Sequence, residues 1–173
     1  MASTLRIPIT EQDHLAGDLT AKIHLIEYGD YQCPHCGNAY SILKQIQQEL
    51  GSSLLFVFRN FPLTEVHPFA MQAAIAAEAA NLQNRFWEMH DIIYENQSKL
   101  SKGGLFNLAK KINLDMDRYK TDIDDENLRT KVEKDFEGGM RSGVNFTPSF
   151  FIDGKKFEGG AEDLHQSLKQ YSL

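Results

Sequence analysis

The two cysteines of the chain stand two residues apart, in the segment Cys33-Pro34-His35-Cys36. Two thiols at this spacing can alternate between a dithiol and a disulfide. The segment follows a short apolar run and precedes a helical pattern, so Cys33 should lie where a helix begins. Unpaired N–H groups and the positive end of the helix dipole favour a thiolate there. We therefore predict that Cys33 is the nucleophile and that Cys36, one helical turn on, resolves a mixed disulfide.

The two residues between the cysteines support this chemistry. Pro34 falls at the first helical position, where a missing N–H costs nothing and the fixed backbone angle suits the helix. A protonated His35 can donate a hydrogen bond to a thiolate at Cys33 and stabilise it further. Because a stabilised reduced form makes a dithiol a better oxidant, we expect a couple more oxidising than that of thioredoxin.

Two other interpretations of the cysteine pair are less favoured. A structural zinc site usually has four protein ligands, and the sequence offers no second Cys-x-x-Cys and no suitably spaced histidine pair. Two inert buried thiols are also less favoured, because the start of a helix is a position that lowers the pKa of a thiol and makes it reactive. We expect no metal ligands, and neither a metal nor an organic cofactor.

Glu27 is a carboxylate in an apolar strand pattern. It alternates with Ile23 and Leu25, so it should share their face and point into apolar surroundings. Burial raises the pKa of a carboxyl group, which could then relay the proton that Cys36 must lose. The alternative is a strand-end carboxylate that reaches water. We favour the proton relay.

The elements that position these residues follow from periodicity. A strand over 22–28, a helix over 33–50 and an apolar strand over 54–61 predict a parallel βαβ unit. Residues 64–143 carry helical patterns, beginning with an Ala-rich helix over 69–82. Strands over 149–152 and 155–157, joined by a turn at Asp153-Gly154, precede a last helix over 161–171.

This outline predicts an α/β fold that consists of βαβ and ββα units with an inserted all-helical domain. We divide the chain into a domain formed by 1–63 plus 144–173 and a helical insertion over 64–143. At 173 residues the chain is long enough to bury a sizeable core.

Composition argues weakly against some partners and locations. The net charge of −6 does not suit nucleic acid binding, because phosphate recognition needs a basic surface. No apolar stretch approaches the roughly 20 residues of a membrane-spanning helix, so we expect no membrane insertion. The first residues lack the apolar core of a secretory signal. We therefore expect a cytoplasmic protein, or a periplasmic one if a leader has been removed; the oligomeric state is not predicted.

Several motifs together resemble one family. The active-site segment 27–36 is similar to that of DsbA-like thiol-disulfide oxidoreductases, which have a thioredoxin fold. It is most similar to the bacterial branch that occurs as stand-alone proteins and as domains fused to sodium/proton antiporters. The similarity extends, in order, over four more segments: 56–63, 67–70, 86–90 and 143–152.

The resemblance implies a role for several residues. It implies a nucleophile at Cys33, a resolving thiol at Cys36 and the buried carboxylate of the family at Glu27. It also implies a cis peptide at Thr147-Pro148 that faces the disulfide, with the neighbouring backbone holding an extended substrate segment. One position departs from the pattern, because Phe146 stands where this branch usually has a small residue, often glycine. A bulky side chain there could change substrate preference.

Other candidates are weaker. Arg59 could tune Glu27, but we interpret it as an exposed arginine at a strand end. His67 and His90 are interpreted as helix-start and packing residues.

The predicted function is thiol-disulfide exchange with protein or small thiol substrates and with an unidentified redox partner. The alternative is a redox-silent module that binds peptides as a chaperone does.

Overall fold

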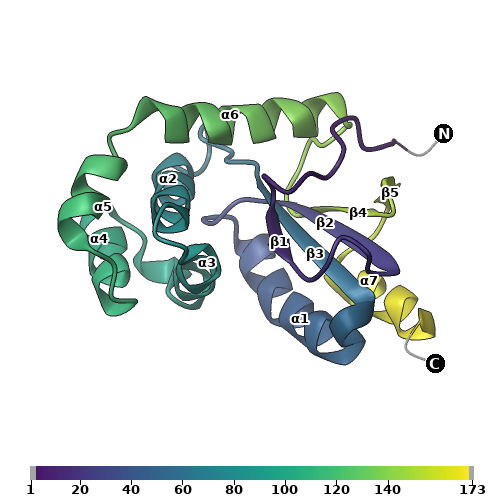
Figure 1. Ribbon diagram of the computed structural model, residues 1–173. Coiled ribbons are helices and arrows are strands. Elements are labelled where there is room, and N and C mark those ends of the chain that lie inside the picture. Colours follow the sequence, from purple (N-terminus) through teal and green to yellow (C-terminus); the bar gives the residue numbers. More distant parts are fainter. Residues whose placement is uncertain (1–2, 172–173) are drawn as a thin grey trace.

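The computed structural model describes residues 3–171 of the chain. A central sheet is joined to a group of helices that occupies one end of the molecule (Figure 1). The strands are β1 (His14–Ala16), β2 (Ile23–Gly29), β3 (Leu54–Asn60), β4 (Ser149–Ile152) and β5 (Lys155–Phe157). The helices are α1 (Pro34–Leu50), α2 (Ala70–Asn81), α3 (Phe86–Glu95), α4 (Lys102–Lys111), α5 (Met116–Asp122), α6 (Glu126–Arg141) and α7 (Ala161–Leu168). Short 3₁₀ turns are η1 (Gly51–Ser53), η2 (Gln97–Lys99) and η3 (Lys169–Tyr171).

The five strands form one mixed sheet in the order β1-β3-β2-β4-β5. β2 and β3 are parallel and are connected by α1, as a βαβ unit requires. β4 runs antiparallel to β2, and β5 forms a hairpin with β4. The βαβ and ββα units and the helices between them agree with the predicted fold. Each described strand or helix that was predicted is present, with ends shifted by one or a few residues.

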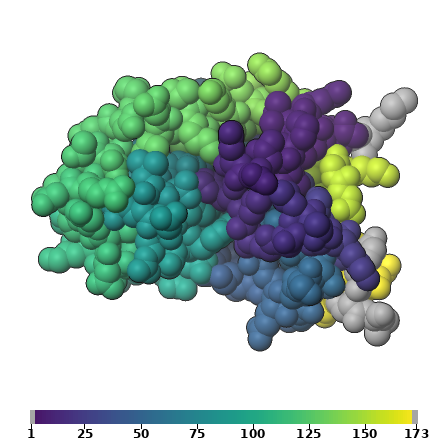
Figure 2. All heavy atoms as spheres, in the orientation of Figure 1, coloured from purple at the N-terminus to yellow at the C-terminus, as the bar shows by residue number. Residues whose placement is uncertain are grey.

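Each face of the sheet is covered by its own apolar cluster. Alternate residues of β2, such as Ile23 and Leu25, pack with α1, α3 and α7 on one face. The other residues, such as Ile26 and Tyr28, pack with the C-terminal part of α6 and with the N-terminal segment. In the space-filling view this segment covers the sheet beside the helical group (Figure 2). β2 and β3 are therefore buried on both faces, as the apolar run in β3 predicts.

The helical group comprises α2 to α6 (Figure 1). Seven of the twelve residues of α2 are alanines, and the helix is buried nearly all round, so its neighbours can approach closely. The division of the chain into two domains stays a prediction. Within residues 3–171, no helix is both long and apolar enough to cross a membrane.

Three expectations need correction. β1 was not predicted, and it pairs antiparallel with β3 at the edge of the sheet. The last α-helix ends at Leu168, and a 3₁₀ turn replaces its expected final turn. Arg59 is not exposed, because only 3% of its surface is accessible. Its guanidinium donates to the Asp13 carboxylate at 2.8 and 3.0 Å, and this ion pair satisfies the buried charge.

Candidate active site

The two cysteines lie where α1 begins, next to the end of β2. Cys33 is the N-cap residue, in extended conformation, and Pro34 opens the helix. Both cysteines are free thiols, and Cys36 is fully buried while 4% of the surface of Cys33 is accessible. The thiol of Cys33 is therefore the one that an incoming sulfur can reach.

The surroundings of the two thiols give them different pKa values. A hydrogen bond with the Cys36 thiol lowers the pKa of Cys33 to about 5, although burial opposes this. Backbone N–H groups of Cys36 and His35 at the start of the helix lower it further. Burial raises the pKa of Cys36 well above its usual range, and the hydrogen bond to Cys33 adds to this. At neutral pH the pair holds one thiolate, at Cys33, and one thiol, at Cys36.

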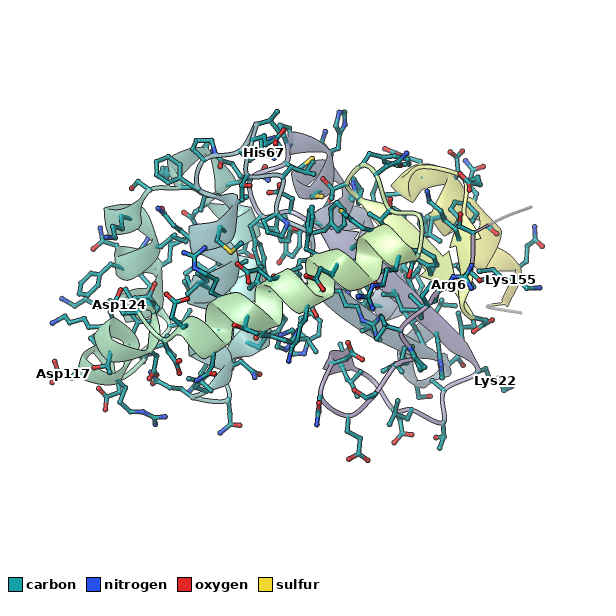
Figure 3. The ribbon with its side chains drawn as sticks, turned by 90° about the horizontal axis from the view of Figure 1, so that it is seen from above. Arg6, Lys22, His67, Asp117, Asp124 and Lys155 are labelled. Carbon is teal, nitrogen blue, oxygen red and sulfur yellow. The ribbon has the colours of Figure 1, made fainter. Side chains whose placement is uncertain are left out.

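Asp30 holds the loop that precedes Cys33. Its buried Oδ1 accepts hydrogen bonds from the backbone N–H groups of Gln32 at 2.7 Å and of Cys33 at 3.2 Å. Its Oδ2 accepts one from the N–H of Leu63 and contacts Nδ1 of His67, both at 2.8 Å. Figure 3 shows His67 on the loop between β3 and α2. We did not predict this role for Asp30, although an aspartate three residues before Cys33 is a known turn signal.

Gln97 connects the helical group to the same loop. Its Nε2 donates to the carbonyl oxygens of Tyr31 at 2.9 Å and of Cys33 at 2.7 Å. Gly37 makes room for it, because a Cβ at that position would collide with the Gln97 amide. Nothing in the sequence signals this contact, since 60 or more residues separate the partners.

The Glu27 side chain lies on the buried face that its alternation predicts, with 1% of its surface accessible. Its Oε1 has no hydrogen-bond partner within the part of the chain that the structure describes. Burial raises the pKa of this carboxyl to about 8, and the negative charge at Cys33 adds to the shift. Glu27 in turn raises the pKa of Cys36. The carboxyl of Glu27 is therefore electrostatically coupled to both cysteines, since the charge at Cys33 raises the pKa of Glu27 and the charge at Glu27 raises the pKa of Cys36.

The Thr147–Pro148 peptide bond is cis and lies against the nucleophile. Sγ of Cys33 lies 3.5 Å from the carbonyl oxygen of Thr147, to which it donates a hydrogen bond when the thiol is protonated. The topology explains this proximity, because β4, which follows Pro148, pairs with β2, which leads to the cysteines. Residues more than 100 positions apart thus meet at one end of two neighbouring strands.

A groove of about 660 Å³ opens beside the cysteines. Its wall includes His35, Thr147 and Pro148, and also Phe146, whose side chain is largely exposed. The ring of His35 has no hydrogen bond within residues 3–171, so a stabilising effect of this ring on the Cys33 thiolate stays a prediction. His90 is a packing residue as expected, while His67 contacts Asp30. The same described residues contain no group of three or more potential metal ligands.

Comparisons with known proteins point to one family. A family model described as "Thioredoxin" matches residues 9–170. The sequence is 36% identical over 156 residues to the Na(+)/H(+) antiporter NhaA 1 of Salinispora arenicola. That match covers 90% of this chain and 24% of the antiporter, so the chain spans about a quarter of the length of this relative.

Solved structures share the fold over nearly the whole chain. The oxidised BdbD of Bacillus subtilis superposes with a TM-score of 0.83 at 23% identity, covering 99% of both chains. The thiol-disulfide exchange protein alpha-DsbA2 of Wolbachia pipientis gives a TM-score of 0.80 at 18% identity, covering 93% of this chain and 88% of its own. The predicted thioredoxin fold with a helical insertion is thereby confirmed.

Proposed function

Because the chain belongs to the thioredoxin family, we propose that it is a thiol-disulfide oxidoreductase that works through the Cys33–Cys36 couple. The observation that carries this proposal is the difference in accessibility and in pKa between the two thiols at the start of α1. One is a partly accessible group whose pKa is lowered to about 5, and the other is a buried group whose pKa is raised. Inert cysteines would not need this asymmetry.

The exchange proceeds through a mixed disulfide. With the oxidised protein, a substrate thiolate attacks Sγ of Cys33, the Cys33–Cys36 bond breaks, and Cys36 leaves as a thiolate that takes up a proton. A second substrate thiolate then attacks the substrate sulfur of the mixed disulfide. It forms the substrate disulfide and releases Cys33 as a stabilised thiolate. In the reverse direction Cys33 attacks a disulfide, and Cys36 resolves the intermediate.

Glu27 supplies and removes the proton of Cys36 in this scheme. A carboxyl with a pKa of about 8 is present in both protonation states near neutral pH, so it can act in either direction. Thr147 and Pro148 position the substrate, since they lie next to Cys33 and line the groove. The substrates proposed are proteins or small thiols, with a separate redox partner that restores the starting state.

Two variants test the proposal against the alternative of a redox-silent peptide-binding module. Cys36→Ser should accumulate a mixed disulfide when its Cys33 thiolate attacks a peptide disulfide and releases one peptide thiolate, because the resolving thiol is absent. Cys33→Ser should form none and should lose all turnover of dithiol substrates. Mass spectrometry of the trapped adducts and a dithiol oxidation assay measure both. If Cys33→Ser keeps full turnover, or Cys36→Ser traps nothing, the proposal is wrong.

A further inference from the structure

We propose that the groove beside Cys33 selects substrates in which a lysine or arginine neighbours the reacting cysteine, and that Glu158 and Glu162 bind this basic side chain. The inference rests on the proposed function and adds to it a preferred class of substrate. It follows from where these carboxylates lie and from the fact that the fold leaves them without partners.

Glu158 and Glu162 line the same groove as Thr147 and Pro148. Glu158 follows β5, and Glu162 lies in the first turn of α7. Thr147, whose carbonyl oxygen lies 3.5 Å from the Cys33 sulfur, is part of the groove wall, so residues that flank the reacting cysteine of a substrate can enter the groove. The two carboxylates belong to the same wall and are available to those residues.

Neither carboxylate makes an ion pair or a side-chain hydrogen bond within residues 3–171. The neighbouring Asp163 is different, because its Oδ2 accepts a hydrogen bond from the N–H of Gly160 at 3.1 Å and so caps α7. Asp163 thus accepts a capping hydrogen bond, whereas the carboxylates of Glu158 and Glu162 have no such partner, although Glu162 also lies at the positive end of the α7 dipole.

The basic groups at the groove do not cancel this charge. Lys156 lies close to Phe146, but its Nζ donates to the Gly143 carbonyl at 2.8 Å and stands 5.1 Å from the centre of the Phe146 ring. Its ammonium group is thus held by the Gly143 carbonyl and does not pair with either glutamate. His35 is the titratable group of the wall nearest the cysteines. Glu158 and Glu162 are thus the acidic residues of the groove wall, and Lys156 is not part of that wall.

The rest of the groove wall suits a polar, extended segment with a long side chain. Thr147 is 5% exposed, and apart from an interaction with the Cys33 thiol that lowers the pKa of that thiol, its Oγ1 has no hydrogen-bond partner within the described residues. Such a buried hydroxyl gains stability from a donor or acceptor that a ligand brings. Phe146 is 52% exposed and offers apolar surface to the alkyl part of a lysine or arginine. These two features, independent of the acidic pair, point to a bound peptide.

The expected preference for basic substrates is modest, because Glu158 and Glu162 are exposed to solvent. Exposed ion pairs contribute roughly 0.2–1 kcal/mol each, which corresponds to about a 1.4- to 5-fold change in rate or affinity per pair. Acidic walls also steer cationic substrates, and salt screens this effect. We therefore expect a rate advantage of roughly threefold to tenfold for a lysine-flanked peptide over a neutral one at low salt.

The test uses the full-length oxidised protein and three short dithiol peptides that differ only in flanking Lys, Gln or Glu residues. Second-order rate constants of peptide oxidation are measured and divided by the rates of the same peptides with glutathione disulfide, which corrects for the intrinsic reactivity of each thiol. The expected order is Lys, then Gln, then Glu, with smaller differences at high salt. The double variant Glu158→Gln/Glu162→Gln should bring the Lys-to-Gln ratio close to one.

Asp117→Asn is the matched control, since it removes one negative charge in α5, at the far end of the helical group (Figure 3). It should keep the full ratio. If the wild-type ratio is one, or if the double variant keeps it, the inference is wrong while oxidation of the neutral peptide still supports the proposed function. If the wild type does not oxidise the neutral peptide at all, both proposals fail.

Discussion

At the scale of residues, the two cysteines of the site differ in charge, with an anion at Cys33 and a neutral thiol at Cys36. The start of α1 and the thiol of Cys36 stabilise an anion at Cys33. Burial next to Glu27 keeps Cys36 protonated. The same buried region that makes Cys36 a poor nucleophile at rest thus provides the group that can deprotonate it. The two cysteines differ in function because they differ in environment.

The different pKa values of the two thiols predict how the rate of alkylation depends on pH. The rate at which iodoacetamide modifies the reduced protein should rise with pH through a midpoint near 5, because the thiolate of Cys33 is the reactive species. Cys33→Ser should react slowly across the same range, since Cys36 is buried and its pKa is raised. A midpoint near the ordinary thiol pKa of about 8.5 would contradict the assigned environment.

Glu27 predicts a pH-dependent stability. Its folded pKa of about 8 lies above the ordinary value of 4.5, so its contribution is complete below pH 4.5 and is lost as pH rises through 8. Glu27→Gln has no such loss. In the oxidised protein the thiols do not titrate, and burial, the larger of the two causes, still raises the pKa of Glu27. The free energy of unfolding of Glu27→Gln relative to wild type should therefore increase as the pH rises above about 5. The increase should be on the order of a few kcal/mol.

Urea unfolding at several pH values measures this difference. Glu133→Gln is a suitable control, because Glu133 lies on the exposed side of α6 and its variant should track wild type at every pH. A flat difference between Glu27→Gln and wild type would mean that the carboxyl is not buried as the structure has it.

Sequence patterns predict some of these residues and miss others for a physical reason. Alternation along β2 predicts the face that Glu27 shares with Ile23 and Leu25, because strand geometry alone decides which face a residue occupies, and the carboxyl is buried because helices cover that face. The same local view gave the wrong environment for Arg59, whose partner Asp13 lies 46 positions away. Local patterns indicate which way a side chain points, and the chain topology decides what it meets there.

At the scale of elements, α6 lies unusually close to the sheet. A Cβ at Gly139 would stand 2.7 Å from the Phe61 ring and 2.9 Å from the Tyr28 ring. Gly139 is therefore the residue that lets the end of α6 pack on this face, next to the segment that returns to Pro148. The glycine of a helix interior, which ordinarily weakens a helix, here allows close packing.

Two glycine substitutions test this arrangement. Gly139→Ala should lower the free energy of unfolding by about 1–3 kcal/mol, because the rings must shift. Gly103→Ala, in α4 with open space around it, should leave the stability unchanged or raise it by up to about 1 kcal/mol. Thermal or urea unfolding of both variants gives the comparison. Equal effects of the two changes would contradict the close approach of α6.

The elements that were not predicted from the sequence are those that have little apolar periodicity of their own. β1 spans three residues, too short for a visible alternation, and pairing with β3 defines it. The contact between η2 and the active-site loop has the same character, because Gln97 is polar and lies outside any periodic run. By contrast, α1, α2 and β3 have long periodic or apolar stretches, and they were predicted to within a few residues.

At the scale of the whole molecule, the helical group and the sheet share one buried network. The carboxylate of Glu78 in α2 contacts Nε2 of His14 in β1 at 2.8 Å and accepts from Nδ2 of Asn60 in β3 at 2.7 Å. Lys131 of α6 lies 3.8 Å from it. A large apolar cluster also includes residues of both parts. The helical insertion is thus packed as part of the same structure that holds the cysteines.

The redox potential depends on the whole fold, because it depends on how much folding stabilises the reduced form relative to the oxidised form. The folded protein stabilises the thiolate of Cys33, whereas the unfolded chain does not, so folding favours the reduced form over the oxidised one. By the thermodynamic cycle, the reduced protein should have the larger free energy of unfolding, and its potential should lie above the roughly −270 mV of thioredoxin. Redox titration against glutathione and urea unfolding of both forms measure the two sides of this cycle. A potential at or below that of thioredoxin, or an oxidised form more stable than the reduced one, would show that the thiolate at Cys33 is not stabilised by the fold.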